Sequence, residues 1–397
     1  MSQKVIIAGG GIGGMSAALA LLQKGIDVEV YEQAAELKEV GAGIQISPNG
    51  SRALDVLGVY ENVKSNSCNP ERKEFRLWNT GKSWLMFDLG KDAVQQYGYP
   101  YLTVYRPDLL QALIEGVRAI KPDAIHLGRK ARGYRQTEDS VMLELEDGAS
   151  IQGDALIGAD GVRSVIRHAL WGASKPEFSG MVAWRGVIPM EKLPEHMRTM
   201  VGSTWIGPGG HAVNYPLHRG TIMNFVGTIE RGDWQIESWS QKGSAQECHN
   251  DFAGWHDDVQ TLIACSPELH KWALMQREPM AQWSSGRVTL LGDAAHATLP
   301  FLAQGAVQSI EDGVILARCF EKYADNVQAC LSNYEHARRD RTTRMVRGAA
   351  ANTHRFHSAE LATDADAEAY LQREWSSNPI KDRYDWLYKY DVQTAEI

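Results

Sequence analysis

The most constraining feature of the chain is a glycine-rich segment that directly follows a short apolar run near the N-terminus. Residues 4–8, KVIIA, predict a buried strand, and residues 9–14, GGGIGG, match the pattern G-x-G-x-x-G. Residues 15–24 predict an Ala/Leu-rich helix, and residues 26–31, IDVEVY, alternate as a second strand. Strand, glycine loop, helix and strand in this order predict the first unit of a Rossmann-like α/β domain.

The glycines of this loop have separate physical roles in binding a dinucleotide. Gly9 permits the tight turn, Gly11 lets the backbone approach a pyrophosphate, and Gly14 allows close contact between helix and strand. The free N–H groups and the positive dipole at the start of the helix attract phosphates. Glu32 ends the second strand about 20 residues further on, where an acid binds ribose hydroxyls. We therefore predict a bound dinucleotide, although the motif does not say which one.

Composition argues against several other classes of protein. The chain has 397 residues and a formal net charge of −8 without a basic tail, which argues against nucleic-acid binding. No window approaches about 18 consecutive apolar residues, and no signal-peptide pattern opens the chain, so we expect no membrane span and a cytoplasmic location. The five cysteines show no C-x-x-C spacing, which indicates reduced thiols and no metal site.

Two later segments each place an aspartate between an apolar strand and a helix. Residues 154–167, DALIGADGVRSVIR, contain Asp160, and residues 287–313 place Asp293 after the strand RVTLL, followed by a small-residue turn at 304–306. Alone, each aspartate is more typical of a helix N-cap or a turn. An aspartate in this position can instead bind a polyol such as ribitol, and a Gly/Ala helix start can offer N–H groups to an anionic ring.

Taken together, these segments resemble the single-component FAD-dependent aromatic hydroxylases, the group A flavoprotein monooxygenases with the para-hydroxybenzoate hydroxylase fold. The resemblance spans residues 4–350 and includes the glycine loop, Asp160-Gly161, Gly292-Asp293 and Arg106 in YRPDLLQAL. The chain is most similar to the branch of salicylate hydroxylase, 3-hydroxybenzoate 6-hydroxylase and 6-hydroxynicotinate 3-monooxygenase. The segments that carry this similarity are EVGAGIQISPNG (39–50), WIGPGGHAVNYPL (205–217) and GDAAHATLPFLAQGAVQSIEDG (292–313).

The resemblance implies that the dinucleotide is FAD and that the chain has no separate Rossmann domain for NAD(P)H. The pyrophosphate would lie at the glycine loop and the ribose at Glu32, with Ala131 on the adenine side. The residues that the resemblance assigns to FAD are Gly9, Gly11, Gly13, Gly14, Glu32, Gln45, Arg106, Ala131, Asp160, Asp293, Gly305 and Ala306.

The resemblance also implies a reaction, the hydroxylation of a hydroxylated aromatic carboxylate with NADH and O2 through a C4a-hydroperoxyflavin. NADH is favoured over NADPH only by the similarity to this branch. Such a reaction needs a base near the ring hydroxyl and a pocket that excludes water. His211 and Tyr215 lie four residues apart in a predicted strand, so both point to one face. We interpret His211 as the base or proton relay and Tyr215 as its hydrogen-bonding partner, the alternative being a satisfied sheet histidine and a packed tyrosine.

Other residues are weaker candidates for the substrate pocket. We expect Arg185 and Tyr101 to line it, with Arg185 either binding a substrate carboxylate or pairing with a structural acid. Pro300 stands where the resemblance places a glutamine in the 3-hydroxybenzoate enzyme, so a histidine–glutamine relay is not available in that form and the substrate stays open. His296 is close in sequence and is expected to be structural.

We expect an α/β fold with a Rossmann-like FAD-binding domain of the GR2 type, an inserted β-sheet substrate domain and C-terminal helices. Successive strands are expected over residues 181–230. The basic run ARRDRTTR at 337–344 is expected on a solvated helix face or in salt bridges of a homodimer. The expected domains are FAD-binding at 1–75, 100–175 and 280–350, substrate at 76–99 and 176–279, and a C-terminal helical tail at 351–397.

Three other functions stay open on the sequence alone. The first is decarboxylative hydroxylation, as in the salicylate and 6-hydroxynicotinate members, which release of carbon dioxide would reveal. The second is a halogenase or epoxidase on the same scaffold, for which residues 184–189, WRGVIP, match the halogenase motif W-x-W-x-I-P only in part. The third is a flavin-binding protein without catalysis, which would need no pair of polar pocket residues.

Overall fold

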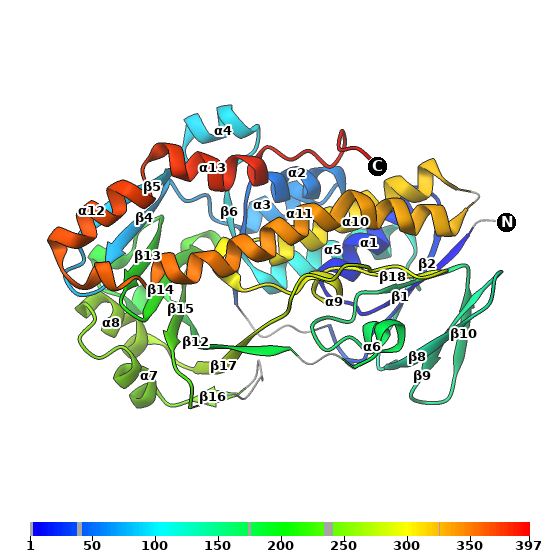
Figure 1. The fold of residues 1–397 in the computed structure, drawn as a ribbon, viewed down its shortest axis with the longest axis horizontal. Coiled ribbons are helices and arrows are strands. Elements are labelled where there is room, and N and C mark those ends of the chain that lie inside the picture. The colour runs from blue at the N-terminus through cyan, green and yellow to red at the C-terminus, as the bar shows by residue number, and fades with distance from the viewer. Residues whose placement is uncertain (1–2, 38–41, 174–175, 234–240, 325) are drawn as a thin grey trace.

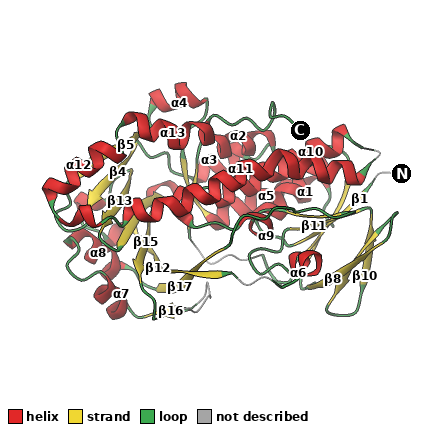
Figure 2. Ribbon diagram, in the orientation of Figure 1, coloured by secondary structure: helices red, strands yellow, loops and turns green. Residues whose placement is uncertain are grey.

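The computed structural model describes residues 3–37, 42–173, 176–233, 241–324 and 326–397, so residues 39–41 of the segment 39–50 lie outside the described residues. Figure 1 shows an elongated molecule with one sheet toward each end. Helix α11 (Val327–Phe356) extends along both parts beside α10 (Gly305–Lys322). Figure 2 shows that most helices gather along one side of the two sheets, which confirms the expected α/β fold.

The glycine loop follows the middle strand of a five-stranded sheet with the order β18-β11-β1-β2-β7. All of its pairings are parallel, and its strands are short and mostly buried because helices cover the sheet. Helix α1 (Ile12–Gln23) packs between α5 (Arg106–Ile120) and α10, so its Ala and Leu residues are buried all round. The strands are β1 (Lys4–Ala8), β2 (Asp27–Tyr31), β7 (Ile125–His126), β11 (Ala155–Gly158) and β18 (Val288–Leu290).

A small antiparallel sheet lies on the other side of the parallel sheet from α1 and α10 (Figure 1). Its order is β10-β9-β8, with bounds β8 (Ala131–Gln136), β9 (Val141–Leu145) and β10 (Ser150–Gly153). Helix α6 (Val165–Trp171) packs beside β8.

The second part of the molecule is built on an eight-stranded sheet with the order β16-β17-β12-β15-β14-β13-β4-β5. β13 and β4 pair in parallel, and the other neighbours are antiparallel. The expected strands over 181–230 are confirmed as β12 to β15. The bounds are β4 (Arg72–Leu77), β5 (Ser83–Asp88), β12 (Glu177–Pro189), β13 (Val201–Gly207), β14 (Gly210–Leu217), β15 (Ile222–Glu230), β16 (Lys242–Gly243) and β17 (Leu269–Gln276).

The remaining elements connect these layers. β3 (Gly43–Ile46) and β6 (Leu102–Tyr105) form a two-stranded sheet between the two parts. The shorter helices are α2 (Pro48–Val56), α3 (Tyr60–Asn66), α4 (Lys91–Tyr97), α7 (Ala245–Asp251), α8 (Asp257–Cys265) and α9 (Asp293–His296). The 3-10 turns are η1 (Met190–Lys192), η2 (Glu195–Met197), η3 (His218–Gly220), η4 (Pro300–Leu302) and η5 (Ala359–Ala362).

Two of the expected domain boundaries fall inside single elements. The boundary between 75 and 76 lies within β4, because this strand pairs with β13 from Arg72 onward. The boundary between 350 and 351 lies within α11, which continues to Phe356 because its residues there pack against a second apolar core beside the eight-stranded sheet. One helix therefore ties the two parts together.

The C-terminal tail is helical, as expected, and packs against the body of the molecule. It forms α12 (Asp364–Glu374) and α13 (Ser377–Tyr388). Trp375, Tyr384 and Leu387 are buried in the core that also contains Phe75 and Phe356. The tail thereby covers the outer side of the second part, where Figure 1 places α12 and α13 beside β4 and β5.

The basic run 337–344 does not form the solvated or intersubunit face that its charge predicts. Arg338 is fully buried, and its guanidinium donates to Asp312 Oδ1 and Glu311 Oε2, each at 2.7 Å. Arg341 donates to both carboxylate oxygens of Glu311, at 2.8 and 2.9 Å. The prediction is wrong for these two arginines because they share the helix face that meets two adjacent acids of α10, whereas Arg339 points outward.

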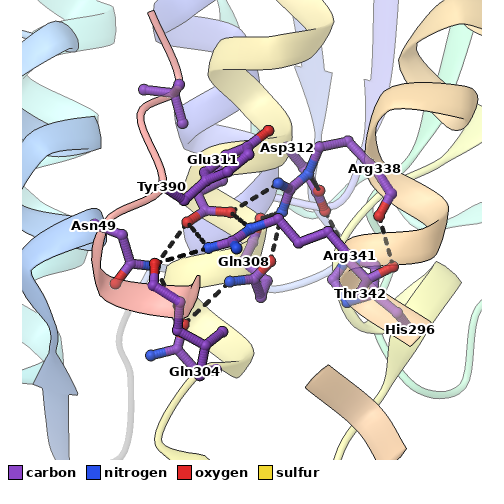
Figure 3. Close-up of polar contacts among 12 residues, drawn as sticks. Asn49, His296, Gln304, Gln308, Glu311, Asp312, Arg338, Arg341, Thr342 and Tyr390 are labelled. Atoms are coloured by element: carbon purple, nitrogen blue, oxygen red, sulfur yellow. Dashed lines mark hydrogen bonds and ion pairs between the residues drawn. The ribbon is translucent and has the colours of Figure 1, made fainter. Parts of the chain in front are cut away.

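Further polar side chains, from these two helices and from neighbouring segments, complete this buried network (Figure 3). Burial acts to raise the pKa of Glu311, but the charges of Arg341 and Arg338 outweigh burial and hold that pKa below its usual range. The pKa of Asp312 is lowered in the same way, with burial opposed by His296 and Arg338. The other members of the network are Asn49, Gln304, Gln308 and Thr342.

The five cysteine thiols form no disulfide in this structure. Among the described residues, no helix is long and apolar enough to cross a membrane. No group of three or more His, Cys, Asp or Glu side chains with metal-binding geometry occurs within the ranges that the structure describes.

Candidate active site

A cavity of about 440 Å³ lies between the parallel-sheet part and the eight-stranded sheet. Its first wall comes from the glycine loop and from the segments that follow β11 and β18. A cavity of this size and mostly apolar lining is typical of small-molecule sites. The second wall is the inner face of the eight-stranded sheet, with Lys73, Arg185, Thr204, His211, Val213, Tyr215, Val226, Thr228 and Trp272.

The glycine loop has the geometry that its sequence predicts. Gly9 has a φ of +110°, and a Cβ on it would overlap the carbonyl of Ala159 in the neighbouring segment. A Cβ on Gly14 would overlap the carbonyl oxygen of Gly9, which explains the close approach of helix and strand. No atom lies within 4 Å of a Cβ built on Gly11, and Gly11 and Gly13 line the cavity. The N-terminus of α1 therefore borders open space.

Glu32 supports the glycine loop from the end of β2. Its Oε2 accepts a hydrogen bond from the Gly10 N–H at 2.7 Å, and its Oε1 accepts one from the Ala34 N–H at 2.8 Å. Glu32 is only half-buried but does not line the cavity, and neither does Ala131 at the start of β8. Contacts of these two residues with the ribose and adenine stay predictions.

The side chain of Asp160 is occupied by the helix that follows it. Its Oδ2 accepts hydrogen bonds from the N–H groups of Val165 (2.7 Å) and Ile166 (3.1 Å), and its Oδ1 accepts one from the Ser164 hydroxyl. Burial raises the pKa of Asp160 in spite of these donors. Asp160 itself does not line the cavity, whereas Gly161 does. The carboxylate of Asp160 thus accepts two N–H groups of α6, whose N-cap residue is Ser164, while the adjacent Gly161 lines the cavity; contact of Asp160 with FAD stays a prediction.

Asp293 differs from Asp160, because its carboxylate is exposed and lines the cavity. It follows Gly292, which has a φ of +62°, and begins the one-turn helix α9. Gly305 and Ala306 begin the 18-residue helix α10 and line the same cavity. The N-termini of α1 and α10 thus meet at one cavity, and each adds partial positive charge there.

His211 and Tyr215 lie on the same face of β14, as period-two geometry predicts, and both line the cavity. His211 is 2% exposed, and the edges of Phe301 and Phe356 pack around its ring at centroid distances of 4.8 and 5.2 Å. Burial lowers the pKa of His211 well below its usual value, and the nearby His357 lowers it further. His211 is therefore a neutral imidazole in this cavity.

His211 belongs to a chain of hydrogen bonds that reaches the surface. Its Nδ1 lies 2.7 Å from Nε2 of His357, and Nδ1 of His357 lies 2.8 Å from Oε1 of Glu230. A carboxylate oxygen accepts, so His357 donates from Nδ1 and accepts at Nε2, and His211 donates from Nδ1. Nε2 is then the acceptor nitrogen of His211. The Glu230 side chain is 54% exposed, so the chain of three side chains connects the cavity with solvent.

Tyr215 lies in a polar cluster at the other end of the cavity wall. Gln45 lines the cavity and accepts hydrogen bonds at Oε1 from the Tyr101 hydroxyl (2.7 Å) and from Lys73 Nζ (3.0 Å). Burial raises the pKa of both tyrosines, although a hydrogen bond with Gln45 partly offsets this for Tyr215. Tyr101 does not line the cavity, which corrects that expectation: its ring is buried beside Tyr388 of the tail, and only its hydroxyl group reaches toward the site, through Gln45.

Of the remaining candidate residues, Arg185 and Pro300 line the cavity, whereas His296 does not. Arg185 on β12 lines the cavity, with its guanidinium 5.4 Å from the ring centroid of Trp272. Pro300 also lines it, in turn η4, where Asn352 of α11 donates to the Phe301 carbonyl at 3.0 Å. His296 does not line the cavity, and its Nε2 lies 2.6 Å from Asp312 in the buried network, in agreement with a structural role.

Comparison with known proteins identifies the family. A family model described as FAD binding domain matches residues 2–349. The chain is 34% identical to 3-amino-4-hydroxybenzoate 2-monooxygenase of Streptomyces platensis, over 98% of this chain and 96% of that protein. It is also 34% identical to 3-hydroxybenzoate 6-hydroxylase of Polaromonas naphthalenivorans, with the same coverage, and to 6-hydroxynicotinate 3-monooxygenase of Pseudomonas fluorescens, over 89% of this chain and 91% of that one.

The chain belongs to the FAD-dependent aromatic hydroxylases. Solved structures of similar proteins include Klebsiella pneumoniae HpxO complexed with FAD and uric acid, with a TM-score of 0.84, 28% identity and coverage of 99% and 97%. A substrate complex of salicylate hydroxylase has a TM-score of 0.81 at 23% identity, covers 99% of this chain and 96% of that one, and shows that the fold is shared.

The residues at the first wall fit the FAD of this family. Gly11 borders open space, so a phosphate could approach its backbone, and the N-termini of α1 and α10 add positive potential. The exposed carboxylate of Asp293 is available to a hydroxyl group of a bound ligand. Arg106 begins α5 and lines the cavity, where its charge suits a phosphate. Gly11, Gly13, Arg106, Asp293, Gly305 and Ala306 are thus positioned to hold the cofactor.

The sequence analysis missed one cavity residue, Lys73, and two residues that connect His211 with the surface, His357 and Glu230. His357 lies at the end of α11 and Glu230 at the end of β15, so they are 127 residues apart and no local motif joins them. Lys73 was missed because a lysine in a short strand is normally exposed. The alternation of β4 gives a weak signal, since Lys73 and Phe75 share one face of that strand.

Proposed function

We propose that this hydroxylase acts on a hydroxylated aromatic carboxylate, with NADH as the electron donor and O2 as the oxygen source. The observation that carries the proposal is the position of His211 and Tyr215 on one wall of a cavity whose other wall holds the N-termini of α1 and α10. Hydroxybenzoates and hydroxynicotinate in the names of the relatives support this class of substrate, and similarity to this branch supports NADH. A homodimer and a cytoplasmic location stay predictions.

The residues of the second wall would remove a proton from the substrate. A ring hydroxyl gives its proton to Nε2 of His211, which releases the proton on its Nδ1 to Nε2 of His357. His357 releases the proton on its Nδ1 to Glu230, whose exposed carboxylate exchanges it with solvent. One proton enters and one leaves at each step. The ring is left with a higher electron density, which is what an electrophilic hydroxylation requires.

Apolar residues surround the cavity end of this proton path. Phe301 and Phe356 pack on the His211 ring, and Val213, Val226 and Trp272 line the cavity between the polar groups. FAD, when bound, would supply the chemistry that passes electrons from NADH to O2. A dry cavity protects that chemistry from loss to hydrogen peroxide.

The proposal is tested by steady-state NADH oxidation with the FAD-loaded protein. The probes are 3-hydroxybenzoate, salicylate, 4-hydroxybenzoate and 6-hydroxynicotinate, and product mass, carbon dioxide and hydrogen peroxide are measured together. We expect at least one probe to accelerate NADH oxidation and to gain one oxygen atom. Release of carbon dioxide with hydroxylation would indicate the decarboxylative alternative. If all four yield only peroxide, or no NADH is consumed, the proposed function is wrong.

A matched pair of variants tests the role of His211. His211→Gln keeps a polar side chain but cannot carry a proton, so we expect turnover to fall about 100-fold with FAD content unchanged. His249 of α7 is exposed and does not line the cavity, so His249→Gln serves as the control and should retain full activity. Equal activity of the two variants would contradict a base at position 211.

A further inference from the structure

We propose that Lys73 is the residue that binds the anionic group of the substrate and selects aromatic acids over their neutral counterparts. This inference rests on the proposed function for the choice of an aromatic ring, but the binding of the anion can be measured without turnover. It is carried by the place of Lys73 on the cavity wall and by the absence of any described acid beside its ammonium group.

Lys73 lies beside Tyr215 on the cavity face of the eight-stranded sheet. Gly202 of β13 separates the two, and a Cβ built on it would lie 3.8 Å from Lys73 Cγ and 3.9 Å from Tyr215 Cβ. Because glycine has no side chain, both neighbours can lean over it. Lys73 Nζ is held by Gln45 Oε1 at 3.0 Å and lies 5.8 Å from the ring centroid of Tyr101. The ammonium group is thus fixed in place by neutral partners.

No described carboxylate forms an ion pair with Lys73, so its charge is not neutralised within the described chain. Burial alone lowers the pKa of Lys73 to about 8. Tyr101 and Tyr215 lie beside Lys73, and burial raises their pKa values. Both tyrosines are therefore neutral at a pH of about 8, where Lys73 titrates, and supply no counter-charge. A partly buried cation of this kind is expensive unless a ligand provides the opposite charge. A carboxylate with two acceptor oxygens fits that requirement.

The geometry of β14 also suits a substrate that joins the two polar ends of the wall. His211 and Tyr215 are four residues apart, which corresponds to about 13 Å along a strand. A single aromatic ring with its hydroxyl group at His211 can therefore direct a carboxylate toward Tyr215 and Lys73. The apolar side chain of Val213 lies between these ends and lines the cavity beneath such a ring.

Arg185 is the other cation on this wall, and it occupies a different place. Three strands, β13, β14 and β15, separate β4 from β12, which puts the two backbones about 19 Å apart across the sheet. The two side chains therefore begin at different places on this wall of the cavity. Arg185 also has the ring of Trp272 beside its guanidinium, at 5.4 Å. These positions make Lys73 and Arg185 separate candidates that one experiment can distinguish.

The experiment compares acids with their amides on the FAD-loaded protein. Changes in the flavin absorbance spectrum give the Kd of 3-hydroxybenzoate and 3-hydroxybenzamide, and of 6-hydroxynicotinate and 6-hydroxynicotinamide. We expect the wild type to prefer the acid of each pair. Lys73→Met should raise the Kd of the acid about 10- to 100-fold and leave that of the amide within about 3-fold, because only the acid loses a charged hydrogen bond. Lys73→Arg should keep a measurable preference for the acid.

Arg185→Met is the matched variant, and it should retain the preference for the acid. A preference that persists in Lys73→Met, or that disappears in Arg185→Met instead, would overturn the proposal, as would a wild type that binds acid and amide equally. If Lys73→Met fails to retain FAD, Lys73→Gln replaces it, since an amide can still donate to Gln45 but carries no charge. The same expectations apply to it.

The outcome for Lys73 can be separated from that for the proposed function. A wild type that hydroxylates the amide as readily as the acid would leave the aromatic hydroxylase in place and refute Lys73 as its selective residue. A wild type that binds the acid through Lys73 but hydroxylates none of the probes would refute the proposed reaction and leave the anion site in place.

Discussion

Replacing Arg338 by methionine should destabilise the protein strongly, because it strands buried negative charge. The side chains of Arg338, Glu311 and Asp312 are each 0% exposed. Without Arg338, Glu311 retains Arg341, but Asp312 retains only His296 Nε2 at 2.6 Å and the Gly292 N–H at 3.1 Å. Removal of one partner from a buried ion pair costs about 3–5 kcal/mol. Since both acids keep some donors, we expect a loss of about 3 kcal/mol, which is roughly a 100-fold change in the unfolding equilibrium.

The control is the same substitution at the next position of α11. The Arg339 side chain is 36% exposed and lies 3.5 Å from Glu335, a partly exposed pair. Arg339→Met should therefore cost less than about 1 kcal/mol. The free energy of unfolding is measured by urea denaturation of the FAD-loaded variants, followed by far-UV circular dichroism and by flavin fluorescence. The double variant Arg338→Met, Asp312→Asn should recover part of the loss, because it also removes the stranded charge.

The dependence on pH has a definite sign. The pKa values of Glu311 and Asp312 are lowered in the folded protein, so these acids contribute stability above their unfolded pKa values, and that contribution is lost as pH falls through the folded ones. Arg338 is part of the cause, so the difference between wild type and Arg338→Met should be largest at neutral pH and should shrink in acid. A loss no greater than that of Arg339→Met, or a difference that is the same at pH 7 and in acid, would refute this reasoning.

Three further predictions concern the cavity. Gly11→Ala should yield folded protein with little FAD, because its Cβ meets no protein atom but enters the open space beside the loop. Gly14→Ala should instead reduce the soluble yield, because its Cβ overlaps a backbone carbonyl. The FAD content per chain and the soluble yield test both variants, and a fully FAD-loaded Gly11→Ala protein would contradict the prediction. Glu230→Gln should lower kcat about 10-fold for an aromatic acid that the wild type hydroxylates, with an unchanged Kd, because the proton path loses its terminal acceptor. Steady-state assays measure kcat, and an unchanged value would argue against the proton path. Binding of 3-hydroxybenzoate should weaken as pH rises through about 8, where Lys73 loses its proton, while binding of 3-hydroxybenzamide stays constant. A Kd of the acid that stays constant from neutral pH to well above 8 would exclude Lys73 as the residue that binds the anionic group.

The cofactor side of the site could be predicted because its signals are local. The glycine loop, its flanking strands and the start of α1 occupy consecutive residues, and the steric needs of a tight turn restrict the sequence at Gly9 and Gly14. The shared face of His211 and Tyr215 follows equally from the two-residue period of one strand. Contacts of this kind depend on neighbours along the chain, so residue order alone determines them.

The direction of individual polar side chains depended on which surfaces meet in the folded chain. The carboxylate of Asp160 accepts hydrogen bonds from two N–H groups of α6, which a strand–aspartate–helix pattern alone does not reveal. The hydroxyl group of Tyr101 reaches only Gln45, because the tail covers its ring. Arg338 is buried rather than solvated, because α11 presents it to two acids of α10.

The sequence by itself determined the α/β fold, the cofactor loop and the strand that carries His211. Only the tertiary structure decided which side chains lie beside His211 and Lys73, because these neighbours come from distant segments. His211 contacts His357 across 146 residues, and Lys73 meets Tyr215 only where β4 and β14 flank Gly202 of β13. Hydrogen bonds and charges act over a few ångströms in space, and packing of the sheet against α11 and the tail sets those distances.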